Sequence, residues 1–312
     1  MSEEKVIDFM GKRRIAGIFS SILIIVSIIS LCVNGLQLGL DFTGGTLLEV
    51  EYKQPVSLDV IREQLTNGGY HNFNVVKYGA DTDVLIRLQQ NLTVDTGEQA
   101  KQGEVLLNVL KRDGASVELK RMEYVGPQVG DELRDKGGLG ILLAFFLIML
   151  YVAFRFEFKF SAGAIVALFH DVIVTVGMFS LFKWDFDLNV LAAVLSIIGY
   201  SINDTIVIYD RIRENFYKIR RGTVIDTINI SITQTLDRTI ATSLTVVLVL
   251  LALFFFGGEV LHTFSLALLI GCFSGTYSTV YIASAVVVAL GAKREDMIGP
   301  EKTERGEVDD RP

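Results

Sequence analysis

The chain has 312 residues, of which 50% are hydrophobic and 21% are charged, whereas soluble globular proteins usually have about a quarter charged residues. Its formal net charge is −7 and no basic face or tail stands out, which argues against a nucleic-acid-binding protein. The two cysteines lie in apolar runs and the three histidines are far apart in sequence. Neither a disulfide framework nor a metal site is therefore expected.

The apolar residues are clustered into six runs, and a helix of roughly 20 such residues crosses a bilayer. These runs are residues 15–34, 139–154, 162–182, 188–209, 239–256 and 264–290. Lys12, Arg13 and Arg14 precede the first run, and no small-residue cleavage site follows it, so we expect an uncleaved anchor rather than a signal peptide. The sequence predicts a polytopic α-helical membrane protein with six transmembrane helices, the last five within residues 137–292.

Lysine and arginine are concentrated before the first run and after the second, fourth and sixth runs. Because basic residues mark the cytoplasmic side of short connections, residues 1–14 and 293–312 are predicted to be cytoplasmic. Residues 35–136 then lie outside the cytoplasm. The tail 293–312 is rich in charged residues and glycine, a composition typical of disorder.

Residues 35–136 have the patterns of a folded domain. Leu48, Val50 and Tyr52 alternate with glutamates, which is typical of a half-buried strand. Ser57 is placed to cap a helix that carries Leu58, Ile61 and Leu65 on one face. Further strands are expected at 73–78, 84–88 and 117–124, with a second helix around 105–110. The order strand-helix-strand-strand-helix-strand predicts an α+β ferredoxin-like domain between the first two transmembrane helices.

The connection at residues 211–237 begins with polar residues and then places apolar residues near helical spacing. This pattern predicts an amphipathic helix at the cytoplasmic interface. A simple connector is the alternative.

Ionisable residues inside apolar spans are functional candidates, because a charge at the bilayer centre costs about 2.5–3.5 kcal/mol on insertion scales. Asp204, with Asn203 beside it, lies in the fourth run, and Arg238 precedes the fifth. Burial and a nearby arginine act in opposite directions on a carboxyl group, so a change in the separation of Asp204 and Arg238 would make a proton switch. In the alternative interpretation, Asp204 lies toward the cytoplasmic side and Arg238 extends to the interface.

Other polar residues form secondary candidates. His170 and Asp171 lie in the third run and Thr242 in the fifth; Asp171 is alternatively a structural residue satisfied by Thr175 and neighbouring helices. A small-residue face in the sixth run, at Gly271, Ser274, Gly275 and Ser278, permits close helix approach within the chain or to a partner.

A glycine-rich segment at residues 38–45 follows the first run and contains Asp41, Gly44 and Gly45. It is a candidate extracytoplasmic motif. The alternative is a glycine turn in which Asp41 accepts hydrogen bonds from local backbone donors.

Four segments, at residues 38–45, 169–171, 199–215 and 234–239, resemble the SecF family of protein-export membrane subunits in the resistance-nodulation-division superfamily. The resemblance implies a multi-pass protein of the bacterial inner membrane that pairs with SecD in SecDF. It also implies work beside the SecYEG channel and YajC on a translocating unfolded polypeptide, with residues 35–136 in the periplasm. Protons would be the coupling ion, with no other cofactor, and Asp204 and Arg238 match the family's proton-relay positions.

Three functions therefore compete. The first is a subunit of an accessory complex that uses the proton-motive force to assist protein translocation at the periplasmic side. The second is a subunit of a proton-coupled small-molecule or ion transporter of the same superfamily, and the third is an assembly scaffold that consumes no gradient. An enzyme is not expected, because the sequence has no nucleophile elbow, metalloprotease pair or nucleotide loop.

Overall fold

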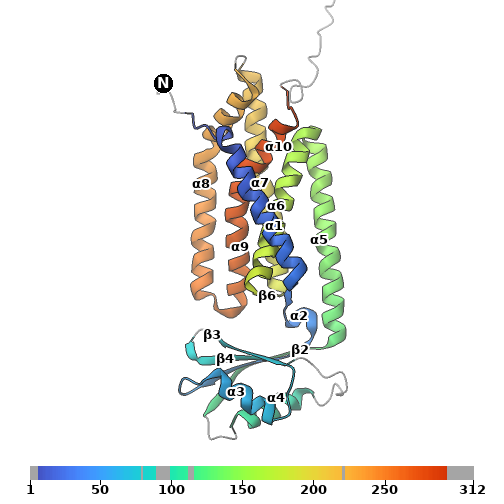
Figure 1. Cartoon of the computed structure of the whole chain (residues 1–312), viewed down its shortest axis with the longest axis vertical. Helices are drawn as coiled ribbons and strands as arrows, with labels where there is room; N and C mark the ends of the chain where they lie inside the picture. Colours follow the sequence, from blue (N-terminus) through green and yellow to red (C-terminus); the bar gives the residue numbers. More distant parts are fainter. Residues whose placement is uncertain (1–5, 79, 89–98, 112–115, 220–221, 294–312) are drawn as a thin grey trace, which may run out of the picture.

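The computed structural model describes residues 6–78, 80–88, 99–111, 116–219 and 222–293. In this part of the chain, a bundle of long helices stands on a small domain of strands and helices (Figure 1). The helices long and apolar enough to cross a membrane number six, as predicted. They span Met10–Asn34, Gln128–Arg155, Phe158–Phe182, Leu188–Lys218, Val224–Phe256 and Leu261–Ala289.

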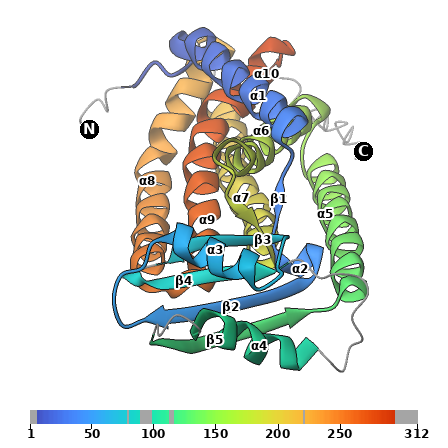
Figure 2. The ribbon, with the colours of Figure 1, turned by 60° about the horizontal axis from the view of Figure 1, so that its bottom comes forward.

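The inner helices of the bundle are α6, α7 and α9, and the first helix packs across α6 (Figures 1 and 2). The last span changes from α-helix to π-helix after Ser278 and then returns to α-helix. The bounds are η1 Met10–Lys12, α1 Arg13–Asn34, α5 Pro127–Arg155, α6 Phe158–Phe182, α7 Leu188–Lys218, α8 Val224–Phe256, α9 Gly258–Ser278, η2 Thr279–Ala283 and α10 Ser284–Ala289.

The small domain follows the predicted order of strands and helices. Its elements are β2 Gly45–Tyr52, α3 Leu58–Asn67, β3 Phe73–Tyr78, β4 Ala80–Leu88, α4 Gln99–Lys111 and β5 Val117–Val125. The strands form one antiparallel sheet in the order β3-β4-β2-β5. Helices α3 and α4 cover the face of the sheet that is turned away from the bundle (Figures 1 and 2).

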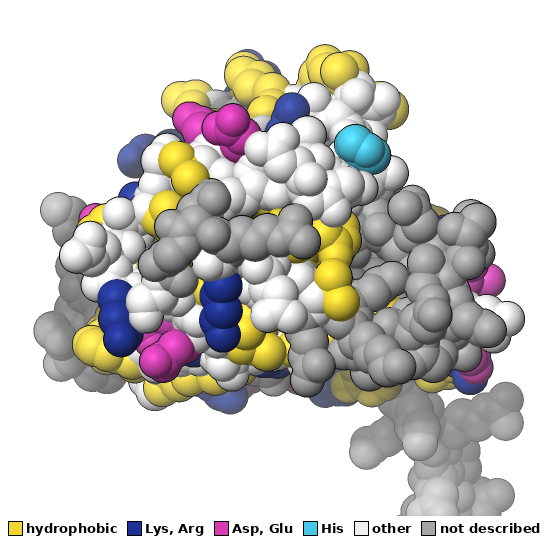
Figure 3. Space-filling view, turned by 90° about the horizontal axis from the view of Figure 1, so that it is seen from below, with side chains coloured by type: hydrophobic (Ala, Val, Ile, Leu, Met, Phe, Trp, Pro, Cys, Tyr) yellow, Lys and Arg dark blue, Asp and Glu magenta, His cyan; other side chains and the backbone are white. Residues whose placement is uncertain are grey.

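The core of this domain confirms the periodicity of the sequence. Leu48 and Val50 are fully buried between the sheet and the helices, together with Ile61 and Leu65 of α3. The Ser57 hydroxyl accepts a hydrogen bond from the backbone N–H of Asp59 and caps α3 as expected. The outer face of the domain carries basic and acidic side chains among scattered apolar ones (Figure 3), in contrast to the apolar flanks of the bundle.

A second, two-stranded sheet joins the domain to the bundle. Strand β1, Gln37–Leu38, pairs in parallel with β6, Asp185–Phe186, which directly precedes α7. The short helix α2, Leu40–Thr43, lies between β1 and β2. Two residues are too few to produce a detectable alternation, so the sequence did not predict this sheet.

The amphipathic segment predicted at residues 211–237 is divided between two long helices. Helix α7 continues to Lys218, and α8 begins at Val224 and runs without a break to Phe256. A capping box of Thr223 and Asp226 starts α8. The apolar residues at the start of α8, such as Ile228, are buried in the core of the bundle.

The start of α1 and the end of α10 lie at the same end of the bundle, opposite the small domain (Figure 1). This arrangement follows from an even number of spans. The predicted disorder of the tail concerns residues that, apart from Lys293, lie outside the described part of the chain.

Candidate functional site

Asp204 lies in the middle of α7 with its carboxylate inside the bundle. The residue is 4% exposed, and its oxygen Oδ2 has no hydrogen-bond partner among the described residues. Arg238 of α8 is exposed on the chain surface; the described residues contain no ion pair between the two, but the charge of Arg238 acts on the Asp204 carboxylate. The structure thus places the predicted pair on two helices that pack together, without an ion pair between them in the part of the chain that it describes.

The neighbouring residue Asn203 points elsewhere. Successive residues on a helix differ by about 100° in direction, and Asn203 is exposed on the chain surface together with Ser196 and Gly199 of the same helix. Thr242 of α8 is exposed as well, and its hydroxyl donates to the Arg238 carbonyl at 3.0 Å. The polar or small residues Ser196, Gly199 and Asn203 are therefore exposed on α7, and Arg238 and Thr242 are exposed on α8. We call these five residues the polar stripe.

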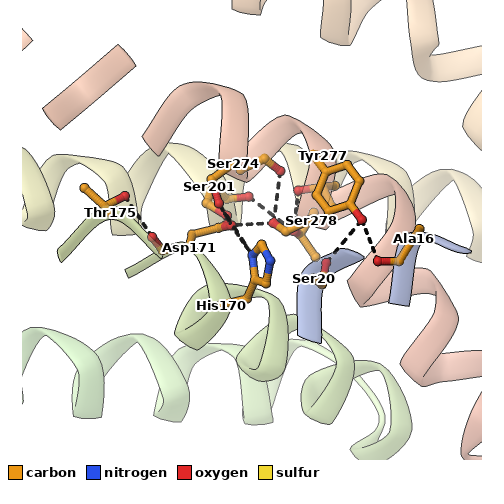
Figure 4. A network of polar contacts seen from close by, with 12 residues as sticks. Ala16, Ser20, His170, Asp171, Thr175, Ser201, Ser274, Tyr277 and Ser278 are labelled. Carbon is orange, nitrogen blue, oxygen red and sulfur yellow. Dashed lines mark hydrogen bonds and ion pairs between the residues drawn. The ribbon is translucent and has the colours of Figure 1, made fainter. Parts of the chain in front are cut away.

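Asp171 of α6 is fully buried and is the centre of a polar cluster (Figure 4). Its Oδ2 accepts hydrogen bonds from Ser201 of α7 at 2.6 Å and Ser278 of α9 at 2.7 Å. Its Oδ1 accepts from Ser274 of α9 at 2.7 Å and lies 3.0 Å from Nδ1 of His170. The cluster ties three inner helices together around one carboxylate.

A tyrosine extends this cluster toward the first helix. The ring of Tyr277 lies 6.1 Å from that of His170, centroid to centroid. The Tyr277 hydroxyl donates to the Ala16 carbonyl at 2.8 Å and accepts from Ser20 at 3.2 Å. This ring contact and the hydrogen bonds of Tyr277 therefore link α6 through α9 to α1 (Figure 4).

The sequence identified Asp171 and the serines separately but did not connect them. Ser274 and Ser278 are one turn apart and were assigned to a small-residue packing face, so their hydroxyls were not matched to the carboxylate of another span. Thr175 does not satisfy that carboxylate, because its hydroxyl donates to the Asp171 backbone carbonyl at 2.8 Å. The packing face itself is internal to the chain, since a Cβ at Gly271 would overlap the side chain of Ile197.

The glycine-rich segment lies at the junction of the two parts. Asp41 Oδ2 accepts a hydrogen bond from the backbone N–H of Leu188 at 3.0 Å, so Asp41 reaches the first turn of α7 rather than only its own loop. Gly44 ends α2, and Gly45 has φ 129°, with the Leu88 carbonyl in the space where a Cβ would lie. A side chain at position 45 would therefore be strained and would clash.

Charged residues from both parts surround this junction. Arg87 of β4 forms an ion pair with Asp185 of β6 at 2.6 Å. Asp187 caps α7 by accepting from Val190 N–H at 2.8 Å. Burial raises the pKa of Asp187, and the nearby negative charge of Asp41 adds to this effect. These residues line a cavity of about 270 Å³.

The junction and the Asp171 cluster are built from different chemistry, and neither resembles a metal site. Among the residues that the structure describes, no group of three or more His, Cys, Asp or Glu side chains is arranged to hold a metal ion. Among the described residues, the buried ionisable groups of the bundle include the carboxylates of Asp204 and Asp171 and the imidazole of His170.

Known proteins match the chain along most of its length. Residues 105–293 match the family described as protein export membrane protein SecD/SecF, C-terminal, and residues 29–56 match the SecD/SecF GG motif. The protein translocase subunit SecF of Pseudomonas aeruginosa is 48% identical over 308 residues, which cover 98% of both chains.

Two crystal structures of SecDF are also similar. SecDF of Thermus thermophilus, described as a translocon-associated membrane protein, is 36% identical with a TM-score of 0.83, covering 94% of this chain and 40% of that one. SecDF in a super-membrane-facing form is 36% identical with a TM-score of 0.67, covering 92% of this chain and 39% of that one.

Proposed function

The chain belongs to the SecD/SecF family of protein export membrane proteins, with the SecF translocase subunits as its full-length relatives, and we propose that it uses the proton-motive force to assist protein translocation. It spans only 40% of the SecDF chain of known structure. The working unit is therefore a pair of this chain and a SecD-type partner. Like the relatives after which the family is named, it takes part in protein translocation.

The observation that carries the proposal is the state of Asp204. A buried carboxylate is normally paired or fully hydrogen-bonded, yet Asp204 is 4% exposed and its Oδ2 has no hydrogen-bond partner in the described part of the chain. The charge of Arg238 acts on this carboxylate, and no ion pair joins the two residues there. A small movement of α8 relative to α7 would change this interaction and so change whether Asp204 holds a proton.

The polar stripe at Ser196, Gly199, Asn203, Arg238 and Thr242 supports an interface with the partner. Polar and small residues on a transmembrane surface normally face protein or water, since lipid cannot pair with them. A SecD-type half packed on this stripe would enclose Arg238 together with Asp204. The relay would then be completed by both chains, and SecYEG and YajC would contact the assembled pair.

The fold also supports an orientation in the bacterial inner membrane. The basic segments lie at the end of the bundle that holds the start of α1, and the small domain lies at the other end. By the positive-inside rule both termini are cytoplasmic and the domain is periplasmic. The antiparallel strand order β3-β4-β2-β5 of this domain supports a ferredoxin-like unit. We propose that this unit lies on the side of the complex where the translocating polypeptide emerges.

The junction offers a route from the proton site to this domain. Asp41 and the β1–β6 pairing hold the domain to the first turn of α7, and Asp204 lies about 24 Å farther along the same helix, at about 1.5 Å per residue. A shift of α7 on protonation would therefore be transmitted to the domain as a rigid displacement.

Replacement of Asp204 by Asn tests the proposal, with Asp210→Asn as a matched control on the same helix. Asp210 forms its ion pair with Arg155 at 2.8 Å near the surface, away from the buried carboxylate. We expect Asp204→Asn to abolish the gradient-dependent part of protein export and the Asp210 variant to retain it. Normal gradient-stimulated export with Asp204→Asn would instead support a scaffold.

A further inference from the structure

A second ionisable site lies one helix away from Asp204. His170 is 2% exposed, and its ring nitrogen Nε2 is buried without a hydrogen-bond partner among the described residues. A buried polar atom without a partner is costly in a structural residue. A purely structural role for His170 therefore does not explain its unpartnered Nε2.

The hydrogen bonds of Asp171 determine which nitrogen of the His170 ring carries the hydrogen. Three serine hydroxyls donate to the Asp171 carboxylate, at 2.6, 2.7 and 2.7 Å, an arrangement that suits the ionised form. The 3.0 Å contact between Asp171 Oδ1 and His170 Nδ1 then requires a hydrogen on Nδ1. With Nδ1 as the donor, Nε2 carries the free lone pair and is the basic atom of the ring.

We propose that His170 Nε2 is a second proton-binding site in the bundle, oriented and charge-balanced by Asp171. A hydrated proton transfers to the Nε2 lone pair: an N–H bond forms, an O–H bond of the hydronium breaks, and water leaves. The ring becomes imidazolium beside an Asp171 anion, so the pair is neutral when loaded, and no electron is transferred. This inference rests on the proposed function, since it adds a second station to the same proton movement.

The neighbours of the pair are suited to this role. Tyr277 on α9 is the titratable group in ring contact with His170, and its hydroxyl leads to Ser20 of α1. On α7, the neutral Ser201 donates a hydrogen bond to Asp171 and lies one turn before Thr205. Thr205 bonds Thr279 of η2 at 3.1 Å and directly follows Asp204 in sequence. Among the described residues, no charged side chain of α1, α5 or α10 forms an ion pair with His170 or Asp171.

The π-helical turn η2 adds a place where the cluster can move. It begins directly after Ser278, which bonds Asp171, and its first residue is Thr279. Such turns interrupt the regular ladder of hydrogen bonds and are frequent at functional sites. A change of charge at His170 would act on a segment that contacts both α6 and the Asp204 region of α7.

The first test observes the proton directly. The full chain with His71→Gln and His262→Gln has His170 as its sole histidine and leaves the site intact. In lipid vesicles, ¹⁵N NMR of labelled histidine should show Nε2 unprotonated in the neutral ring and protonated in the imidazolium, with a reversible change as the pH is varied over the range in which the chain stays folded. A ring that keeps one protonation state over this range would overturn the proposal.

The second test measures proton uptake by vesicles that contain the chain with its partner subunit. We expect His170→Gln to reduce uptake about a hundredfold, the low end for loss of a positioned proton-transfer group, and His262→Gln, a matched control, to leave it unchanged. Normal uptake with His170→Gln but defective uptake with Asp204→Asn would overturn this inference alone. Normal uptake with Asp204→Asn would overturn the proposed function, and the NMR titration would still decide whether His170 binds a proton.

Discussion

The carboxylate of Asp41 accepts a hydrogen bond from the backbone N–H of Leu188 at 3.0 Å. These residues are 147 positions apart in sequence and belong to different parts of the molecule, the glycine-rich segment and the first turn of α7. The first N–H groups of a helix have no partner within the helix, so Asp41 stabilises α7 from outside. The helix that carries Asp204 is therefore capped by the segment that leads into the small domain.

The first prediction concerns this cap. Asp41→Ala removes the acceptor, and we expect the free energy of unfolding to fall by about 1 kcal/mol, as for other lost N-terminal caps. Export should also fall, because the link between α7 and the domain is weakened while Asp204 is intact. Asp41→Asn keeps an acceptor oxygen and serves as the control. Thermal unfolding of the purified chain and an export assay in cells measure both effects; equal behaviour of the two variants would refute the cap.

The second prediction concerns the ion pair between Arg87 of β4 and Asp185 of β6, which lie 2.6 Å apart. Either charge reversal, Arg87→Asp or Asp185→Arg, should destabilise the junction, and the double variant should recover part of the loss. The coupling energy from the double-mutant cycle should be about 1 kcal/mol, the upper end for exposed pairs, since both side chains are mostly buried. Additive effects of the two single changes would show that the pair contributes nothing.

Much of the fold could be predicted from local patterns. The alternation at Leu48 and Val50 identified a strand whose apolar side is fully buried, and Ser57 marked the start of α3. The six spans followed from run length. The ends of the spans did not, because α7 and α8 extend beyond the apolar runs. There, Asn215 of α7 donates a hydrogen bond to Ser231 of α8, and Asn229 of α8 accepts one from the backbone N–H of Met10 in η1.

The candidate site could be predicted only in part, because its contacts join distant segments. Asp204 was identified by its charge in an apolar run, and its burial agrees with that argument. The environment of Asp171 depends on the rotation of three helices, which brings Ser201 and Ser278 to the same oxygen. Hydrophobic periodicity indicates which side of a helix is buried but not which buried hydroxyl meets which carboxylate.

The third prediction concerns the polar stripe, the surface proposed to contact the partner subunit. A Cβ at Gly199 of α7 would meet no atom within 4 Å, and the same holds for Gly140 of α5. Gly199→Leu and Gly140→Leu should therefore both be accepted by the isolated chain. Only Gly199→Leu should prevent copurification with the SecD-type partner, because position 199 lies on the polar stripe beside Asn203. Loss of copurification with Gly140→Leu alone would place the interface on α5 instead.

The last prediction concerns pH and Asp187. Burial, with the negative charge of Asp41, raises the pKa of Asp187 in the folded chain above its unfolded value of about 3.9. Between the two values the folded state binds the extra proton, so stability is greatest at low pH and falls as the pH rises through the folded pKa. Asp187→Asn keeps an acceptor for the Val190 N–H and has no charge, so its stability should lack this fall and exceed that of the wild type at neutral pH.

Asp187→Ala separates the cap from the charge. It loses the 2.8 Å hydrogen bond from Val190 N–H, which should lower stability by about 1 kcal/mol at every pH relative to the Asn variant. The free energy of unfolding of the wild type and the two variants is measured in detergent from about pH 4, near the pKa of an unfolded aspartate, to about pH 7. The comparison gives the contribution of the cap and the contribution of the charge. Parallel curves for wild type and Asp187→Asn would mean that the carboxylate is solvated at the junction and that its charge is not felt by the fold.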